Sequence, residues 1–211
     1  DDPTLAGLRA EAAALEVWLS IGSLALQTDD PDGRFANRSF VINPAGDIVA
    51  RYDKIHMFDV EVSEAETYRE SAGYRPGNRA VMAQTPFGQL GLSICYDLRF
   101  AYLYRALAQA GANILLVPSA FSPVTGAAHW QPLLQSRAIE TGCYVLAAAQ
   151  TGDHGGRETY GHSMAVSPWG EVLLDAGTTK SVSIVDINPH AVSDARKRIA
   201  ALSHDRTFEG P

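Results

Sequence analysis

One cysteine of this sequence stands where nucleophilic chemistry could be done. Cys95 ends the apolar run GLSIC and is followed at once by the residues YDLR. We therefore expect it at a turn between a strand and a helix, where backbone N–H groups can stabilise a thiolate or an oxyanion. The competing interpretation is a buried, inert thiol, because free cysteine is among the most buried residue types. Cys143 opens a run of small apolar residues and is interpreted as a core residue.

A thiol nucleophile needs a proton acceptor and a positive group near the developing oxyanion. Histidine is the usual acceptor, and a Cys/His pair is compatible with the spacing of the six histidines: His56, His129, His154, His162, His190 and His204. Lys54, in RYDKIH, offers another arrangement, since it follows an apolar strand and opens a long loop. Its competing interpretation is an ordinary surface lysine.

The elements that must position these residues predict an α/β protein with a mixed sheet or two stacked sheets covered by helices. The central pattern is strand, helix, strand, helix, strand, with hairpins on both sides. Residues 54–77 lack a period and are expected to form a long irregular loop. Strands are expected at 17–26, 38–43, 48–53, 113–121, 143–150 and 181–187, hairpins at 79–95 and 161–177, and helices at 3–16, 99–112, 129–142 and 188–202.

Composition limits the classes of function. The 211 residues suit a single domain spanning 1–211, and 46% hydrophobic residues supply a core. The net charge of −7 argues against a nucleic-acid partner, and no apolar run has the length of a membrane span. Two cysteines without a CxxC spacing predict neither a disulfide nor a metal site, and they favour a reducing, cytoplasmic location.

Several segments together resemble the nitrilase, or carbon–nitrogen hydrolase, superfamily. They are RYDKIHMFDVEV, YRES, GLSICYDLRF, LLVPSAF, AHWQPLLQSRAIETGCYVLAAAQ and YGHSMAVSPWGE, and they run over nearly the whole chain. Lys-Xaa-His before a loop, followed later by Cys-Tyr-Asp-Xaa-Arg-Phe, is far more specific than either piece alone. The sequence is most similar to the branch whose members act on deaminated glutathione and on ω-amides.

The resemblance implies a four-layer α–β–β–α sandwich and a set of roles. Cys95 would be the nucleophile, Lys54 would stabilise the oxyanion together with the backbone N–H of Tyr96, and Glu70 would position Lys54. Family members also use a first glutamate as general base, and no residue of this sequence matches it. The chain starts at Asp1, immediately before a helix, so we expect it to lack the family's N-terminal strand, helix and strand, and with them competent amidase activity.

Other residues are candidates for holding the substrate. Arg99 could bind a substrate carboxylate through its planar fork, or it could brace the turn by a salt bridge with Asp97. His129 is expected to support the pocket by hydrogen bonds. Residues that follow a strand end could line the pocket, namely Ser119, Phe121 and Thr125.

The resemblance implies a thiol amidase without cofactor or metal that acts on a small amide. Deaminated glutathione is the expected substrate, with short α-keto amides, or N-carbamoyl or nitrile compounds, as alternatives. A non-catalytic scaffold is the alternative of another class, and rapid alkylation of Cys95 with a depressed pKa would argue against it. Apolar and aromatic groups in helices 99–112 and 129–142 predict a homodimer or a larger even-numbered oligomer.

Overall fold

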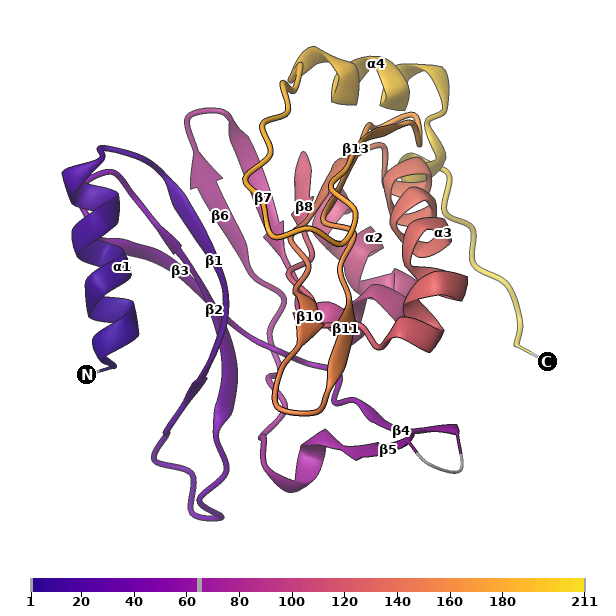
Figure 1. The fold of residues 1–211 in the computed structure, drawn as a ribbon. Coiled ribbons are helices and arrows are strands. Elements are labelled where there is room, and N and C mark those ends of the chain that lie inside the picture. The colour runs from indigo at the N-terminus through magenta and orange to yellow at the C-terminus, as the bar shows by residue number, and fades with distance from the viewer. Residues whose placement is uncertain (1, 64–65, 211) are drawn as a thin grey trace.

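The protein has four layers in the order helix, sheet, sheet, helices (Figure 1). The computed structural model describes residues 2–63 and 66–210. Helix α1 (Pro3–Ala14) covers the outer face of a three-stranded sheet, whereas α2 (Ala101–Gln109) and α3 (Pro123–Thr141) cover a six-stranded sheet. The α–β–β–α sandwich implied by the resemblance is confirmed. Within the described residues, no helix combines the length and apolarity that a membrane crossing requires.

The first sheet forms as the predicted strand–turn–strand pattern indicates. Its strands are antiparallel, and Arg38 lies opposite Asp53 in the register between the second and third of them. Helix α1 starts where expected, because the Asp2 carboxylate accepts a hydrogen bond from the Leu5 N–H at 2.9 Å and caps it. The strands are β1 (Leu19–Leu26), β2 (Ala36–Ile42) and β3 (Ile48–Asp53).

The second sheet contains the predicted strand–helix–strand–helix–strand core. Its order is β13-β12-β9-β8-β7-β6, with β7, β8 and β9 parallel and the outer pairs antiparallel. Helix α2 connects β7 to β8, and α3 connects β8 to β9. The strands are β6 (Met82–Thr85), β7 (Gly88–Leu92), β8 (Ile114–Leu116), β9 (Tyr144–Ala147), β12 (Met164–Val166) and β13 (Val172–Asp175).

Buried clusters hold the layers together, and one of them joins α1 to the first sheet. A second joins the two sheets and includes Tyr52 of β3 and Leu92 of β7, and a third joins the second sheet to its helices around Trp130 and Leu134. All four side chains are 1% exposed or less. Burial of such side chains typically contributes about 1.5–3 kcal/mol each to the free energy of unfolding, so the strand ends that carry the site are rigidly placed.

The expected irregular loop at 54–77 contains a hairpin, and that prediction is wrong in this part. Strands β4 (Asp59–Ser63) and β5 (Glu66–Arg69) pair antiparallel and lead into a short 3₁₀ turn at Glu70–Ala72. The alternation of Val60 and Glu61 fits a strand with one solvent-exposed face. The many charged residues nearby favoured the interpretation as a loop. A second hairpin, β10 (Thr151–Asp153) with β11 (Glu158–Tyr160), was also missed.

The segment 181–187 is not a strand, although its alternation predicts one. In the described part of the chain it pairs with no neighbour, and Val182 and Ile184 are 94% and 89% exposed. A strand exists only where another strand accepts its hydrogen bonds, so sequence alternation alone did not decide this segment. The predicted helices at 129–142 and 188–202 also shift: α3 starts at Pro123, with Ser122 as its cap, and α4 is limited to His190–Arg198.

Candidate active site

Cys95 lies at a strained turn between β7 and α2. Its φ is +50°, a left-handed conformation that a non-glycine residue rarely adopts. Such a conformation costs of order 1–3 kcal/mol and persists only where the surroundings impose it. The backbone N–H of Cys95 donates to the Pro118 carbonyl at 2.9 Å, which ties the turn to the end of β8. The expected strand-to-helix position of this thiol is therefore realised as a sharp corner.

Asp97 anchors the corner from behind. Its fully buried carboxylate accepts hydrogen bonds from the Ile94 N–H at 2.9 Å and the Tyr52 hydroxyl at 2.6 Å. The backbone N–H and the Nδ1 atom of His56 lie 3.0 and 2.6 Å from the same carboxylate. Burial and the nearby Asp97 charge raise the pKa of Tyr52, so its hydroxyl stays protonated and donates. Asp97 thus stabilises the turn at Cys95 through these contacts. The salt bridge considered between Asp97 and Arg99 is not formed.

Lys54 and Glu70 form a buried ion pair. Lys54 is 3% exposed, and its Nζ atom lies 2.5 Å from Glu70 Oε2. The same oxygen accepts from the Phe58 N–H at 2.6 Å, and Glu70 Oε1 accepts from Asn37 Nδ2 at 3.0 Å. A carboxylate with these partners holds the ammonium in one place.

Asn37 was not identified from the sequence. Its carbonyl accepts the backbone N–H of Lys54 at 2.9 Å, while its side chain reaches Glu70. The signal was available, because the hairpin of β2 and β3 sets Arg38 opposite Asp53 and therefore Asn37 beside Lys54. A polar side chain at that register position is a natural candidate for part of the site.

A cavity of about 770 Å³ brings these residues together. Cys95, Lys54, Glu70 and Asn37 line it, and we call these four residues the floor. It opens at the carboxyl ends of the parallel strands β7, β8 and β9, the usual position of ligand sites in such sheets. The hairpins β4–β5 and β10–β11, which we call the mouth, lie at one end of the molecule (Figure 1), and both contribute residues to the cavity lining.

The structure brings only part of the predicted substrate-binding set into this cavity. Ser119 lines it, whereas the other four candidates do not. Both terminal nitrogens of Arg99 lie 3.3 Å from His129 Nδ1, outside the lining. Phe121 packs on Trp130 in the core, and the Thr125 N–H bonds Ser122 Oγ at the start of α3.

Burial raises the pKa of the Cys95 thiol above its ordinary value. The positive charge of Lys54, the Ala120 backbone and the Ser119 hydroxyl act in the opposite direction, while the Glu70 charge adds to the rise. This direction is opposite to the depressed pKa that would argue against a non-catalytic scaffold, so the reactivity of the thiol in solution remains the test of that alternative. A thiol that is protonated at rest needs a base that removes its proton during attack.

No base in the cavity is available among the described residues. Glu70 is the one carboxylate of the described lining, and both of its oxygens already accept hydrogen bonds. Glu61 pairs with Arg69, and Glu64 lies outside the described residues. No histidine of the described chain lines the cavity either, so the Cys/His arrangement considered from the sequence is not formed there.

Cys143 lies away from the site. It is fully buried, its Sγ atom is 3.2 Å from the Ala112 carbonyl, and Arg196 contacts it from α4. Burial raises the pKa of this thiol as well. Its placement agrees with the interpretation as a core residue.

Cys95, at its strained corner, and the buried Lys54–Glu70 pair line one cavity, and comparison with known proteins shows the family of the chain. Residues 1–197 match the Carbon-nitrogen hydrolase family, and the chain belongs to that family. It is therefore an enzyme of the amidase type that hydrolyses C–N bonds.

Individual proteins of known name and structure are similar to the chain over most of its length. The chain is 42% identical over 208 residues to the deaminated glutathione amidase of Yersinia enterocolitica, covering 98% of this chain and 73% of that protein. The crystal structure of the C. elegans NitFhit protein superposes with a TM-score of 0.90 at 38% identity, covering 97% of this chain and 50% of that one.

One similar structure shows a reacted cysteine. It is a glutamate-to-glutamine mutant of the amidase from Nesterenkonia sp. AN1, with acrylamide added at the active-site cysteine. It has a TM-score of 0.74 at 26% identity and covers 93% of this chain and 73% of that one.

Proposed function

We propose that Cys95 attacks the carbonyl carbon of a small amide. The Cys95 Sγ–carbon bond forms while Lys54 and the Tyr96 N–H stabilise the oxyanion. The C–N bond then breaks, and the leaving nitrogen takes a proton equivalent to the one lost by the thiol, which gives a thioester and a free amine. Water next adds to the thioester, the carbon–sulfur bond breaks, and the thiol regains a proton as the acid is released. Cys95, Lys54 and Tyr96 supply the nucleophile and the oxyanion donors, while the base that takes the thiol proton has no available candidate among the described residues of the cavity.

The observation that carries the proposal is the strained corner at Cys95 facing the Lys54–Glu70 pair across one cavity. Left-handed backbone at a non-glycine residue is concentrated at functional sites, where surrounding contacts impose it. Lys54 is already ordered by Glu70 before any substrate arrives. A fixed positive group stabilises the oxyanion without reorganisation, which is the form of catalysis that contributes most in acyl transfer.

We propose deaminated glutathione as the substrate, with 2-oxoglutarate and cysteinylglycine as products. The name of the Yersinia enterocolitica relative supports this choice. The cavity also suits an anionic molecule, because its described lining carries three cationic side chains and one anionic one. Short α-keto amides, which release ammonia, are the alternative substrate class.

Steady-state kinetics on the full-length protein test this proposal. The two substrates to compare are deaminated glutathione and 2-oxoglutaramate, which share one acyl group and differ in the leaving group. We expect a higher kcat/KM for deaminated glutathione. Hydrolysis of neither compound would refute the assignment, and faster hydrolysis of 2-oxoglutaramate would favour the alternative.

We also propose that two copies pair through α2 and α3 in the cytoplasm. Large side chains on these helices are exposed, with Tyr102 at 65%, Val124 at 64% and Ile139 at 59%. The two cysteines are free thiols, as a reducing compartment requires. Sedimentation of a stable monomer at micromolar concentration would contradict the pairing.

A further inference from the structure

The turn of hairpin β10–β11, which is part of the mouth, contributes Arg157 to the cavity lining. Its strands pair Asp153 with Glu158, and the turn between them is closed by the His154 N–H bonding the Arg157 carbonyl at 2.9 Å. The tip contains Gly155 and Gly156, with φ of +70° and +85°, which other residues adopt only with strain. The turn geometry thus fixes where Arg157 leaves the backbone.

Arg157 differs from the two other cations of the cavity. Lys54 is paired with Glu70, and Arg69 lies 2.9 Å from Glu61. Among the side chains that the structure describes, which leave out those of residues 63–66, Arg157 makes no ion pair with a carboxylate. Its guanidinium carbon instead lies 5.9 Å from the centre of the Tyr68 ring on the opposite hairpin. That contact orients the planar group while leaving its hydrogen-bond donors for a ligand.

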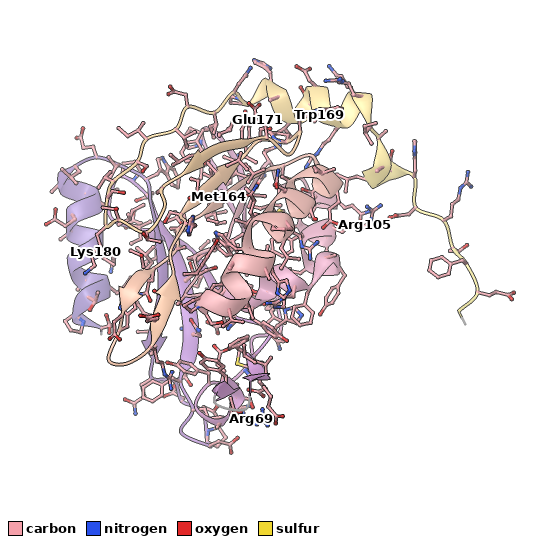
Figure 2. The ribbon with its side chains drawn as sticks, turned by 45° about the vertical axis from the view of Figure 1, so that its right-hand side comes forward. Arg69, Arg105, Met164, Trp169, Glu171 and Lys180 are labelled. Carbon is pink, nitrogen blue, oxygen red and sulfur yellow. The ribbon has the colours of Figure 1, made fainter. Side chains whose placement is uncertain are left out.

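The position of Arg157 in the cavity indicates which end of a bound substrate lies next to this side chain. Cys95 lies on the floor, whereas Arg157 is exposed and its hairpin lies at the same end of the molecule as β4–β5 (Figure 1). Figure 2 shows Arg69, on β5, at this same end and far from Trp169. The acyl group must stay on Cys95 during the thioester stage, while the amine must leave through the opening. The leaving portion is therefore the part nearest Arg157.

We propose that Arg157 binds the terminal carboxylate of the departing amine and so selects peptide amides over primary amides. The inference rests on the proposed function, in which the departing amine is cysteinylglycine. That dipeptide ends in a carboxylate, and the guanidinium fork matches a carboxylate in two parallel hydrogen bonds. Ammonia, the leaving group of a primary amide, offers no such partner. Arg157 thus takes the carboxylate-binding part that the sequence suggested for Arg99.

The test is Arg157→Gln in the full-length protein, assayed with the two amides that share an acyl group. We expect kcat/KM for deaminated glutathione to fall about tenfold to a hundredfold, the usual effect of losing a charge-assisted hydrogen bond. The value for 2-oxoglutaramate should stay within about twofold, since its leaving group has no carboxylate to lose. Arg157→Lys should restore part of the loss, because it keeps the charge without the fork.

Product inhibition gives a second readout that a structural role would not change. The inhibition constant for cysteinylglycine should rise in Arg157→Gln, and that for 2-oxoglutarate should not. Arg206→Gln is the matched control, because it removes the same charge from the exposed C-terminal segment. It should leave both substrates unaffected.

Each other outcome overturns the inference. Equal losses on the two substrates would show that Arg157 shapes the hairpin or holds the acyl group. Unchanged kinetics on both would show that it binds nothing. A wild-type enzyme that hydrolyses 2-oxoglutaramate and not deaminated glutathione would refute the proposed substrate itself, and the inference with it, so the two failures are distinguishable.

Discussion

The floor and the mouth of the cavity are built in opposite ways. On the floor, Lys54 is 3% exposed and Glu70 accepts three hydrogen bonds, from Lys54, Phe58 and Asn37. At the mouth, the Arg69 side chain is 55% exposed and its partner Glu61 is 70% exposed. A buried network fixes geometry to fractions of an ångström, whereas exposed pairs contribute about 0–1 kcal/mol each. This difference fits the proposed division of roles, in which the floor performs the chemistry and the mouth selects the substrate.

The largest expected effect is on the floor, at Cys95. Cys95→Ala should abolish turnover of any amide, because it removes the sulfur atom that forms the thioester in the proposed mechanism. The change is small and alanine fits the space, so the thermal unfolding midpoint should stay close to that of the wild type. Mass spectrometry of the enzyme with a slow substrate should find the acyl adduct on Cys95. An adduct on Cys143, or on no cysteine, would show that the nucleophile is misassigned.

Lys54 and Glu70 come next. Lys54→Met should lower kcat by about 10²–10³, as is typical when an oxyanion donor is lost. Glu70→Gln should act in the same direction, because Lys54 loses the charge that holds it. In both variants kcat should fall more than KM rises, which rapid-quench and steady-state assays measure. Near-normal kcat in either one would mean that the oxyanion is stabilised elsewhere.

Asn37 tests whether the floor acts as a connected network. Asn37→Ala removes the hydrogen bond to Glu70 Oε1 but leaves the Lys54–Glu70 pair intact. We expect kcat to fall about tenfold, in line with the loss of one charge-assisted hydrogen bond. Asn37→Asp is the complementary variant, since it places a second carboxylate against Glu70 and should be worse than alanine. A loss confined to KM would place Asn37 in substrate binding.

The same contrast explains what the sequence could reveal. The places of Cys95 and Lys54 were foreseeable, because each stands where an apolar strand ends, whereas their roles were implied only by the family resemblance. Asn37 needed the strand register, which the hairpin supplied. Arg157 was beyond reach: its hairpin has strands of three residues, and its approach to Tyr68 depends on how two short hairpins meet in space. The prediction of a strand at 181–187 was wrong for the same reason, because strand pairing depends on tertiary contacts that the local sequence does not determine.

The smallest effects, and the finest comparison, concern the charge environment of the thiol. Burial raises the Cys95 pKa, so the thiolate fraction is small near neutral pH. Alkylation of the resting enzyme by iodoacetamide should therefore keep rising with pH beyond about 8.5, where an ordinary thiol begins to level off. Cys143 should react more slowly at every pH, since it is 0% exposed.

Two floor variants should shift this profile in opposite directions. Lys54→Met removes a positive charge that lowers the pKa of Cys95, so the alkylation profile should move to higher pH. Glu70→Gln removes a negative charge that raises the same pKa, so its profile should move to lower pH. Both variants are expected to have a lower kcat, so kcat alone does not separate a charge effect from a general disruption of the floor. A general disruption would move the two alkylation profiles in the same direction. Opposite shifts, measured by mass spectrometry of the alkylated protein between about pH 6 and pH 10, would show that the pair acts on the thiol through its charges. Parallel shifts would mean that Lys54 and Glu70 affect Cys95 through packing alone, and the oxyanion role would then rest on kcat only.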